Sequence, residues 1–358
     1  MTLELKDDLL YCIVFGPGYG ESTLLRTPDQ QWIVVDGCRL PGAGNGVSPA
    51  ERVLSENGAY WSAVVFTHPH EDHAMGLDDV LAMEGASGLV GCCPVVLSSS
   101  AAWMDSMDAE VHLRRGAVEQ VLAAIQDRWE RDSGSRWELY RGSQRQFGDL
   151  AVTVLHPDGE DHSSGQSPNQ LASALLVEWR GCRIVLGADV ERAGWETIQG
   201  HFPDLACHAA LKYPHHGSRG AFHAAFAEGQ GERVWIMTPW NRGSGLPRYE
   251  DGEGLEQALA CCPQIHLTGL PVRHELQGRV PYRTTREALR DGREPSPVQR
   301  QLGEEGLTLS FRPGVEVEPL SHYVAAGFDE NGKLKDLQHG AGTVVVSSEQ
   351  PGPGDRDE

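Results

Sequence analysis

Three histidines and an aspartate fall within six residues of this 358-residue chain, in the stretch Thr-His-Pro-His-Glu-Asp-His that begins at Thr67. The stretch follows the apolar run Ala-Val-Val-Phe, whose β-branched and aromatic residues predict a buried strand. The carboxyl end of a strand is where an α/β sheet usually places its chemistry. Imidazole and carboxylate ligands suit zinc, manganese or iron better than calcium or magnesium. Because His68, His70, Asp72 and His73 are more than one tetrahedral ion needs from a single loop, the sequence favours two metals over a merely solvated loop.

Candidates for further ligands lie downstream. His156, Asp189 and the pair His215 and His216 each come directly after a strand-like apolar run. All of these side chains offer nitrogen or oxygen, which suits a hydrolytic metal site. The eight cysteines include no Cys-x-x-Cys spacing, so we expect buried free thiols in a reducing cytoplasm rather than a metal knuckle.

The His-x-His-x-Asp-His motif and the later Pro-His-His-Gly-Ser resemble those of the metallo-β-lactamase-fold hydrolases. The segments Asn169–Ser173 and Leu211–Ser218 look most like the ComEC/Rec2-type branch of that superfamily, which includes the hydrolase domain of DNA-uptake proteins and phosphorylcholine-esterase-like enzymes. The resemblance spans roughly residues 10–270. It implies an α/β fold, a four-layer αββα metallo-β-lactamase sandwich, here with a helical insertion and a C-terminal extension.

The resemblance also implies a ligand set for two divalent ions, zinc in the first place, with manganese or iron as alternatives. The implied ligands are His68, His70 and His156 on the first ion, Asp72, His73 and one of His215 and His216 on the second, and Asp189 between them. His216 is favoured within the pair, because in related enzymes the histidine just before the small-residue turn coordinates. His215 would then contact the substrate or support the ligands. Asp72, Asp189 and His215 are the implied catalytic residues.

Other residues near these motifs have more than one interpretation. The glycine-rich turn at 16–20 either brings backbone amides to a substrate phosphate or is a tight turn that needs positive φ. Asp36 is expected to buttress the metal loop, and Asn169 and Ser173 to support the site from a neighbouring segment. Lys212 either offers charge to an anionic substrate or faces solvent.

We expect a hydrolase domain over residues 1–270, with the helical insertion at about 98–147. Residues 271–346 are interpreted as a C-terminal extension or small module, and 347–358 as a disordered tail. The insertion and the C-terminal region are where a protein partner would bind. The N-terminus lacks the pattern of a signal peptide and no apolar stretch reaches 18 residues, so a cytoplasmic protein without a membrane span is expected.

The chain is acidic, with 30 Lys and Arg against 51 Asp and Glu and a formal charge of −21. Such a charge works against loose binding to long duplex DNA and favours a small or single-stranded substrate. The leading hypothesis is a dinuclear metal-dependent hydrolase, a phosphodiesterase or nuclease that uses a metal-bridging hydroxide on a phosphoester substrate such as a nucleotide or single-stranded nucleic acid. The alternatives are a hydrolase of another ester (phosphorylcholine, thioester or lactone) and a partner-dependent subunit of a larger assembly.

Overall fold

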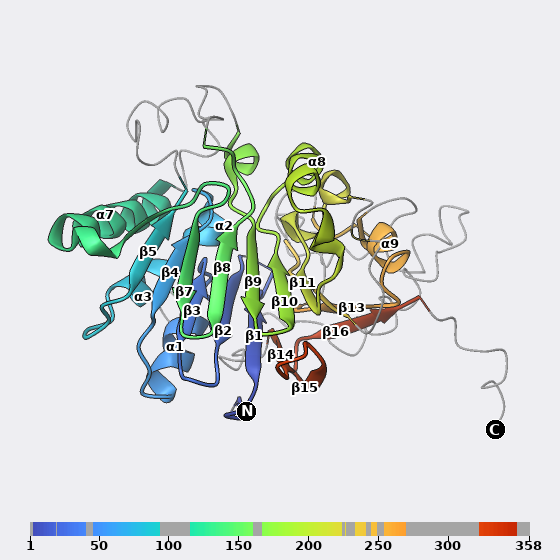
Figure 1. The fold of residues 1–358 in the computed structure, drawn as a ribbon, viewed down its shortest axis with the longest axis horizontal. Coiled ribbons are helices and arrows are strands. Elements are labelled where there is room, and N and C mark those ends of the chain that lie inside the picture. Colours follow the sequence, from blue (N-terminus) through green and yellow to red (C-terminus); the bar gives the residue numbers. More distant parts are fainter. Residues whose placement is uncertain are drawn as a thin grey trace, which may run out of the picture.

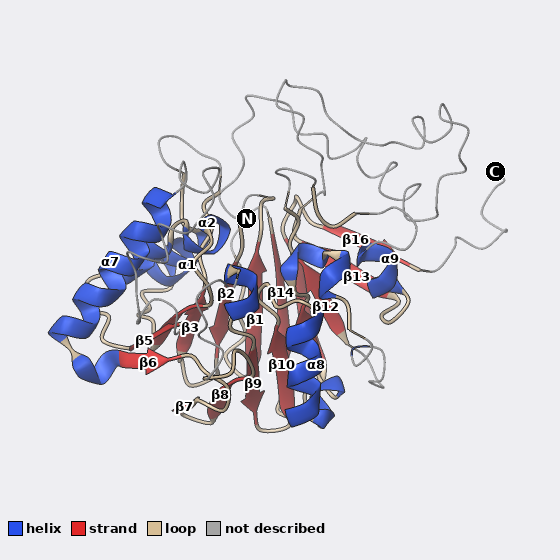
Figure 2. Ribbon diagram, turned by 90° about the horizontal axis from the view of Figure 1, so that it is seen from above, coloured by secondary structure: helices blue, strands red, loops and turns tan. Residues whose placement is uncertain are grey.

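The computed structural model describes residues 3–18, 20–40, 46–93, 115–159, 167–223, 226, 233–240, 245–248, 254–269 and 322–348. Two mixed eight-stranded sheets pack face to face, and helices cover the outer face of each (Figures 1 and 2). The predicted α/β fold with four αββα layers is therefore confirmed. Among the described residues, no helix combines the length and the hydropathy that crossing a bilayer would require.

The first sheet contains the N-terminal strands and has the order β15-β14-β1-β2-β3-β4-β5-β6. Its strands are β1 (Leu10–Phe15), β2 (Ser22–Arg26), β3 (Trp32–Val35), β4 (Ala63–Phe66), β5 (Leu89–Cys92), β6 (Arg136–Glu138), β14 (Tyr323–Phe328) and β15 (Leu334–His339). Its outer face is covered by α1 (Pro49–Glu56), α3 (Leu77–Leu81) and α7 (Arg115–Arg131). Helix α1 begins where Ser48 accepts a hydrogen bond from the amide of Glu51 and proline takes the first helical position.

The second sheet has the order β16-β13-β12-β11-β10-β9-β8-β7. Its strands are β7 (Gln144–Phe147), β8 (Leu150–Val154), β9 (Leu175–Trp179), β10 (Cys182–Leu186), β11 (Ala210–Lys212), β12 (Val234–Met237), β13 (Gln264–Leu267) and β16 (Val344–Ser347). Helices α8 (Arg192–His201) and α9 (Gly254–Leu259) pack on its outer face. Strands β10 to β13 run parallel to one another, so their carboxyl ends meet at one edge of the sheet.

Strand β1 is apolar at every position because it lies between two apolar layers. Tyr11, Ile13 and Phe15 pack in the core beneath the outer helices, whereas Cys12 and Val14 pack against the second sheet. Alternate side chains of a strand point to opposite faces, so a strand between two apolar layers must be apolar on both.

The C-terminal strands lie inside the sandwich. Strand β14 pairs antiparallel with β1 in the first sheet, and β16 pairs antiparallel with β13 in the second. This arrangement differs from the predicted C-terminal extension or small module, because the backbone hydrogen bonds of these strands are made to the two main sheets. The apolar residues at 343–346 predict a short strand, and β16 is present there. The remainder of the C-terminal region, at 270–321 and 349–358, lies outside the described residues.

Part of the predicted insertion is also described. Helix α7 packs on the outer face of the first sheet, where Trp129 Nε1 donates a hydrogen bond of 3.0 Å to the carbonyl oxygen of Val90. Strands β6 and β7 follow α7 and belong to the edges of the two sheets. The first part of the insertion, residues 98–114, lies outside the described residues.

Candidate metal centre

The polar side chains of the site come from loops that follow strands of both sheets. Strands β3 and β4 run parallel in the first sheet, and Asp36 and the histidine loop directly follow them. Asp189 comes shortly after β10, and His215 and His216 come shortly after β11. Because the sheets face each other, these strand ends bring residues far apart in sequence into one cluster.

Asp36 holds the histidine loop in place. Its Oδ1 accepts a 2.8 Å hydrogen bond from the amide of Thr67, and its Oδ2 accepts one of 2.7 Å from the Thr67 hydroxyl. Oδ2 also lies 2.8 Å from His73 Nδ1, which must therefore carry the proton. Nε2 of His73 is then the nitrogen that can bind a metal. The expectation that Asp36 buttresses the loop is confirmed.

The first group of candidate ligands consists of His68, His70 and Asp189, whose ligand atoms all lie within 4.8 Å of one another. His68 Nε2 lies 3.0 Å from His70 Nδ1 and 3.6 Å from Asp189 Oδ2. The Thr67 hydroxyl already donates to Asp36, so its oxygen accepts from His68 Nδ1 at 3.0 Å. That bond leaves Nε2 of His68 deprotonated and directed into the group. Burial, together with the neighbouring His68, lowers the pKa of His70 to about 3, so this imidazole is also neutral.

The second group consists of Asp72, His73, Asp189 and His216. His216 Nε2 lies 3.0 Å from Asp72 Oδ2, and His73 Nε2 lies 3.4 Å from Asp189 Oδ1. His216 Nδ1 donates to the carbonyl oxygen of Thr238 at 3.1 Å, so its Nε2 is the nitrogen available to a metal. Asp189 belongs to both groups, which is the position that a bridging ligand takes.

Two atoms at the centre of these groups, His73 Nε2 and Asp189 Oδ1, are buried without a hydrogen-bond partner in the described part of the chain. Buried polar atoms are rarely left in that state in native proteins unless an ion or water satisfies them. A cation bound between them would provide the missing partner. The donor set, made only of imidazoles and carboxylates, therefore fits divalent metal ions.

The charges of the site also favour cations. Burial opposes ionisation of Asp72 and Asp189, yet in both cases the nearby imidazoles, His73 foremost, hold the pKa of the carboxyl below its usual value. Burial lowers the pKa of His73, but the surrounding carboxylates outweigh it and hold that pKa well above its usual value. In the absence of a metal, a protonated imidazole thus takes the place of the missing positive charge.

Glu21 is a buried acidic residue of the site that the sequence did not reveal. It lies just before β2, and its Oε1 contacts Nζ of Lys212, while its Oε2 accepts a hydrogen bond from the Thr238 hydroxyl. Oε2 also lies 3.4 Å from His216 Nδ1, and Oε1 lies 3.7 Å from His73 Nδ1. Glu21 is thus placed behind both imidazoles of the second group. The interpretation that Lys212 faces solvent was wrong, because its ammonium is buried in this ion pair with Glu21.

Four buried carboxylates surround the centre, on Glu21, Asp36, Asp72 and Asp189, and one buried lysine, Lys212, opposes them. Burying charge without a counter-charge is costly. The four carboxylates and the lysine together carry a charge of about −3 when all are ionised. The charge of the site therefore agrees with the binding of divalent cations.

The two histidines at 215 and 216 face different surroundings. His216 is buried in the second group, whereas the His215 side chain is 20% exposed, with Nδ1 3.4 Å from Glu191 Oε1 and Nε2 3.2 Å from Asn169 Nδ2. Both residues have positive φ, 45° and 50°, an uncommon conformation for non-glycine residues that costs energy. This backbone directs consecutive imidazoles to different sides. His216 thus faces the second group and His215 contacts Asn169, while the choice of His216 as the metal ligand stays a prediction.

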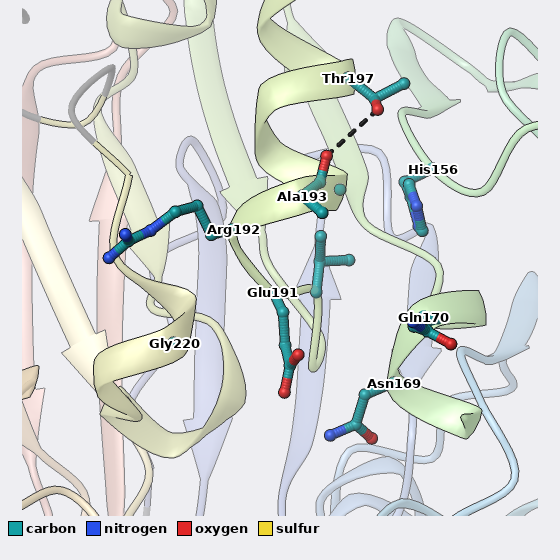
Figure 3. A pocket seen from close by; sticks show the side chains of 10 residues that line it. His156, Asn169, Gln170, Glu191, Arg192, Ala193, Thr197 and Gly220 are labelled. Atoms are coloured by element: carbon teal, nitrogen blue, oxygen red, sulfur yellow. Dashed lines mark hydrogen bonds between the residues drawn. The ribbon is translucent and has the colours of Figure 1, made fainter. Parts of the chain in front are cut away.

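His156 is the predicted ligand that lies outside these His/Asp groups of the described residues. Its Nδ1 donates a 2.9 Å hydrogen bond to the carbonyl oxygen of Ala172, which leaves Nε2 in the deprotonated form that coordinates metals. Its side chain lines a cavity of about 410 Å³ (Figure 3). Its assignment to the first ion stays a prediction. Glu160, Asp161 and His162, a second cluster in the sequence, lie outside the described residues.

The glycine-rich turn before β2 packs against the histidine loop. Gly20 has φ of +135°, and a Cβ at that position would lie 2.7 Å from the carbonyl oxygen of Asp72. The amide of Glu21 donates to the same oxygen at 2.9 Å. The geometry agrees with a tight turn that needs glycine, and the Glu21 amide is already used within the protein rather than offered to a phosphate.

The fold and the site together define a four-layer α/β protein with a buried His/Asp centre suited to two divalent cations. No protein-family model matches the chain, and no curated protein matches it in sequence.

Solved structures with a similar fold include a metallo-β-lactamase from Cronobacter sakazakii, 17% identical over 58% of this chain and 78% of its own, with a TM-score of 0.37. YhfI, a metallo-β-lactamase fold protein from Bacillus subtilis, is 12% identical over 56% of this chain and 70% of its own, with a TM-score of 0.29. CmlA, a diiron β-hydroxylase from Streptomyces venezuelae, is 14% identical over 59% of this chain and 35% of its own length, with a TM-score of 0.37. At such identities and TM-scores, these likenesses concern the fold alone.

Proposed function

We propose that this protein is a dinuclear metal-dependent hydrolase that cleaves phosphodiesters, and that it belongs to the ComEC/Rec2-type branch of the metallo-β-lactamase fold. The observation that carries the proposal is the pair of His/Asp groups that share Asp189. Such a centre, built from nitrogen and oxygen ligands without cysteine, is typical of metal-assisted hydrolysis. The chain's resemblance to that branch favours a phosphoester over a β-lactam amide.

The proposed ligands of the first ion, zinc in the first instance, are His68, His70 and His156. Asp72, His73 and His216 are the proposed ligands of the second ion, with Asp189 between the two. When bound, two such ions would provide a nucleophile from water near neutral pH and would stabilise the negative charge that develops on the phosphoryl oxygens. Asp36, Glu21 and Thr238 would keep the imidazoles oriented through their Nδ1 sides.

His215 is the proposed proton donor to the leaving alcohol. It is more exposed than the buried histidines His68, His73 and His216, which point into the groups. Burial lowers its pKa, but Asp189 and Glu191 outweigh this and raise that pKa above its usual value. A protonated Nδ1 or Nε2 of this partly exposed imidazole could pass its proton to a departing oxygen.

The test combines metal content with a substrate panel. Elemental analysis of the purified, metal-loaded protein should find close to two ions per chain, and His68→Ala and Asp189→Ala should lower that number while folding is retained. Activity should appear on bis(4-nitrophenyl) phosphate or single-stranded DNA and not on a chromogenic β-lactam. His201→Ala, an exposed histidine at the end of α8, is the matched control and should change nothing. A protein with well under one ion per chain, inert with added zinc or manganese, would refute the proposal. Hydrolysis of a thioester or lactone in place of the phosphodiester would replace its substrate class.

A further inference from the structure

The cavity beside the metal centre has a volume of about 410 Å³, large enough for part of a small organic substrate. Its described walls come from the segment after β8, the turn before β9 and the first turns of α8 (Figure 3). The lining residues that bear polar side chains are His156, Asn169, Gln170, Glu191, Arg192 and Thr197. Because His156 is a proposed metal ligand, a substrate bound at the metals would extend into this cavity.

Glu191 places a negative charge in the cavity wall. Its side chain is 48% exposed, and its Oε1 lies 3.4 Å from His215 Nδ1. A carboxyl group as exposed as this one is ionised at neutral pH. Glu191 also occupies the N-cap position of α8, where the helix dipole favours an anion. The Glu191 carboxylate therefore already supplies the negative charge that the N-terminus of α8 favours, so this helix end does not need an anionic ligand.

His215 contacts Glu191 at 3.4 Å but is not among the described residues that line the cavity, and the positively charged lining residue Arg192 does not offset the charge at the same place. In Figure 3 the Arg192 guanidinium points away from the side on which His156, Asn169 and Gln170 lie, whereas the Glu191 carboxylate faces Asn169. The Asn169 amide and the Glu191 carboxylate can accept hydrogen bonds from hydroxyl groups, whereas Gln170 Oε1 already accepts one from the Ser167 amide. A second phosphate placed here would instead meet the Glu191 carboxylate.

We propose that this cavity binds one of the two alcohol groups that the substrate phosphate joins. This group is uncharged and carries hydroxyl donors. Glu191 selects against a substrate in which the group carries a second phosphate. This inference rests on the proposed phosphodiesterase function and deepens it. It favours a small diester over a nucleic acid strand, because each further nucleotide of a strand adds a phosphate. Glu191 is thus a residue that determines specificity through its charge.

The test compares two substrates that differ by one phosphate, thymidine 5′-(4-nitrophenyl phosphate) and the same compound with a 3′-phosphate. Wild-type enzyme should favour the first in kcat/KM, and Glu191→Gln should reduce that preference by about 3- to 10-fold, an effect limited by the exposure of the side chain. The ratio cancels any equal effect of the substitution on both substrates. Glu196→Gln removes the same charge from an exposed position on the same helix and should leave the preference unchanged.

A wild-type enzyme that favours the 3′-phosphorylated substrate, or a Glu191→Gln preference within twofold of wild type, would overturn the inference. If the metal-loaded protein hydrolyses neither compound, the proposed function fails, and calorimetric binding decides the inference separately. Tighter binding of thymidine 5′-monophosphate than of thymidine 3′,5′-bisphosphate, with a smaller difference in Glu191→Gln, would uphold the assignment of the cavity. Equal or reversed affinities, or no binding of either compound, would overturn it.

Discussion

Removing one member of the buried ion pair between Glu21 and Lys212 should destabilise the protein strongly. Removing both members should cost much less than the sum of the two single losses. The side chains are 5% and 2% exposed, and Glu21 also accepts a hydrogen bond from Thr238. Glu21 precedes β2 of the first sheet, and Lys212 ends β11 of the second, so the pair connects the two sheets. Either single substitution leaves the other charge buried without its partner.

The expected magnitude follows from that burial. Breaking a buried pair by removing one partner costs about 3–5 kcal/mol, whereas replacing both charges by groups of similar volume is often close to neutral. Glu21→Gln and Lys212→Met should therefore each lower the free energy of unfolding by about 3–5 kcal/mol. The double variant should lose much less than the sum, which gives a coupling energy of at least about 2 kcal/mol. The measurements belong on chelator-treated protein, because a bound cation would itself compensate a carboxylate.

Urea unfolding followed by tryptophan fluorescence measures these free energies, since the chain has nine tryptophans. The exposed pair of Arg131 and Asp127, with both side chains 65% exposed, is the matched control. Its cycle with Arg131→Met and Asp127→Asn should give a coupling of about 0.5 kcal/mol or less. Single losses below about 1 kcal/mol at Glu21 and Lys212, or additivity within about 0.5 kcal/mol, would refute the reasoning.

Three further predictions concern the surroundings of the site. His208 is buried, accepts a hydrogen bond from Trp235 Nε1 at 3.1 Å, and has its pKa lowered to about 4 by burial. The unfolded chain, with a pKa of about 6.5 at this histidine, therefore binds more protons between these two values, and stability falls as the pH drops from about 6.5 toward 4. This residue should contribute about 2–3 kcal/mol to the difference between pH 7 and pH 4.5. Urea unfolding at both pH values should show a smaller loss for His208→Gln, and an unchanged loss would contradict the assignment. Gly20→Ala should cost more than Gly58→Ala in thermal unfolding, because both positions have positive φ but only the first would place a Cβ against backbone, while the second has nothing within 4 Å. Equal losses would show that the close approach is unimportant. Asp36→Asn should weaken binding of the second ion by about 10- to 100-fold in a competition assay with a chelating dye, because an imidazole Nδ1 loses its anionic partner. An affinity within threefold of wild type would argue against that support.

Much of the candidate centre could be predicted because its groups follow strands. His68, His70 and His73 come from one short motif, and Asp189 and His216 each follow a separate apolar run. Parallel strands end at a common edge, so residues after such runs tend to meet. The structure brings all five of these side chains into the two groups.

The supporting residues could not be predicted in the same way. Glu21 and Lys212 are 191 positions apart, and Glu21 and Thr238 are 217 apart, with no local pattern that relates them. The C-terminal strands were similarly ambiguous. The short apolar run at 343–346 predicts a strand, but nothing in the sequence indicates that β16 pairs with β13 or that residues 323–328 form β14 beside β1.

The sequence by itself determined which donor groups the candidate centre contains, because the kind, number and spacing of the polar residues in the histidine loop are local properties of the chain. It also determined the strands, because the period of apolar residues is local. Only the tertiary structure decided which carboxylates share the second group, which of His215 and His216 faces it, and that Lys212 is buried against Glu21. These depend on how the two sheets pack against each other. Packing brings residues together although nothing in their positions along the sequence indicates that they are in contact.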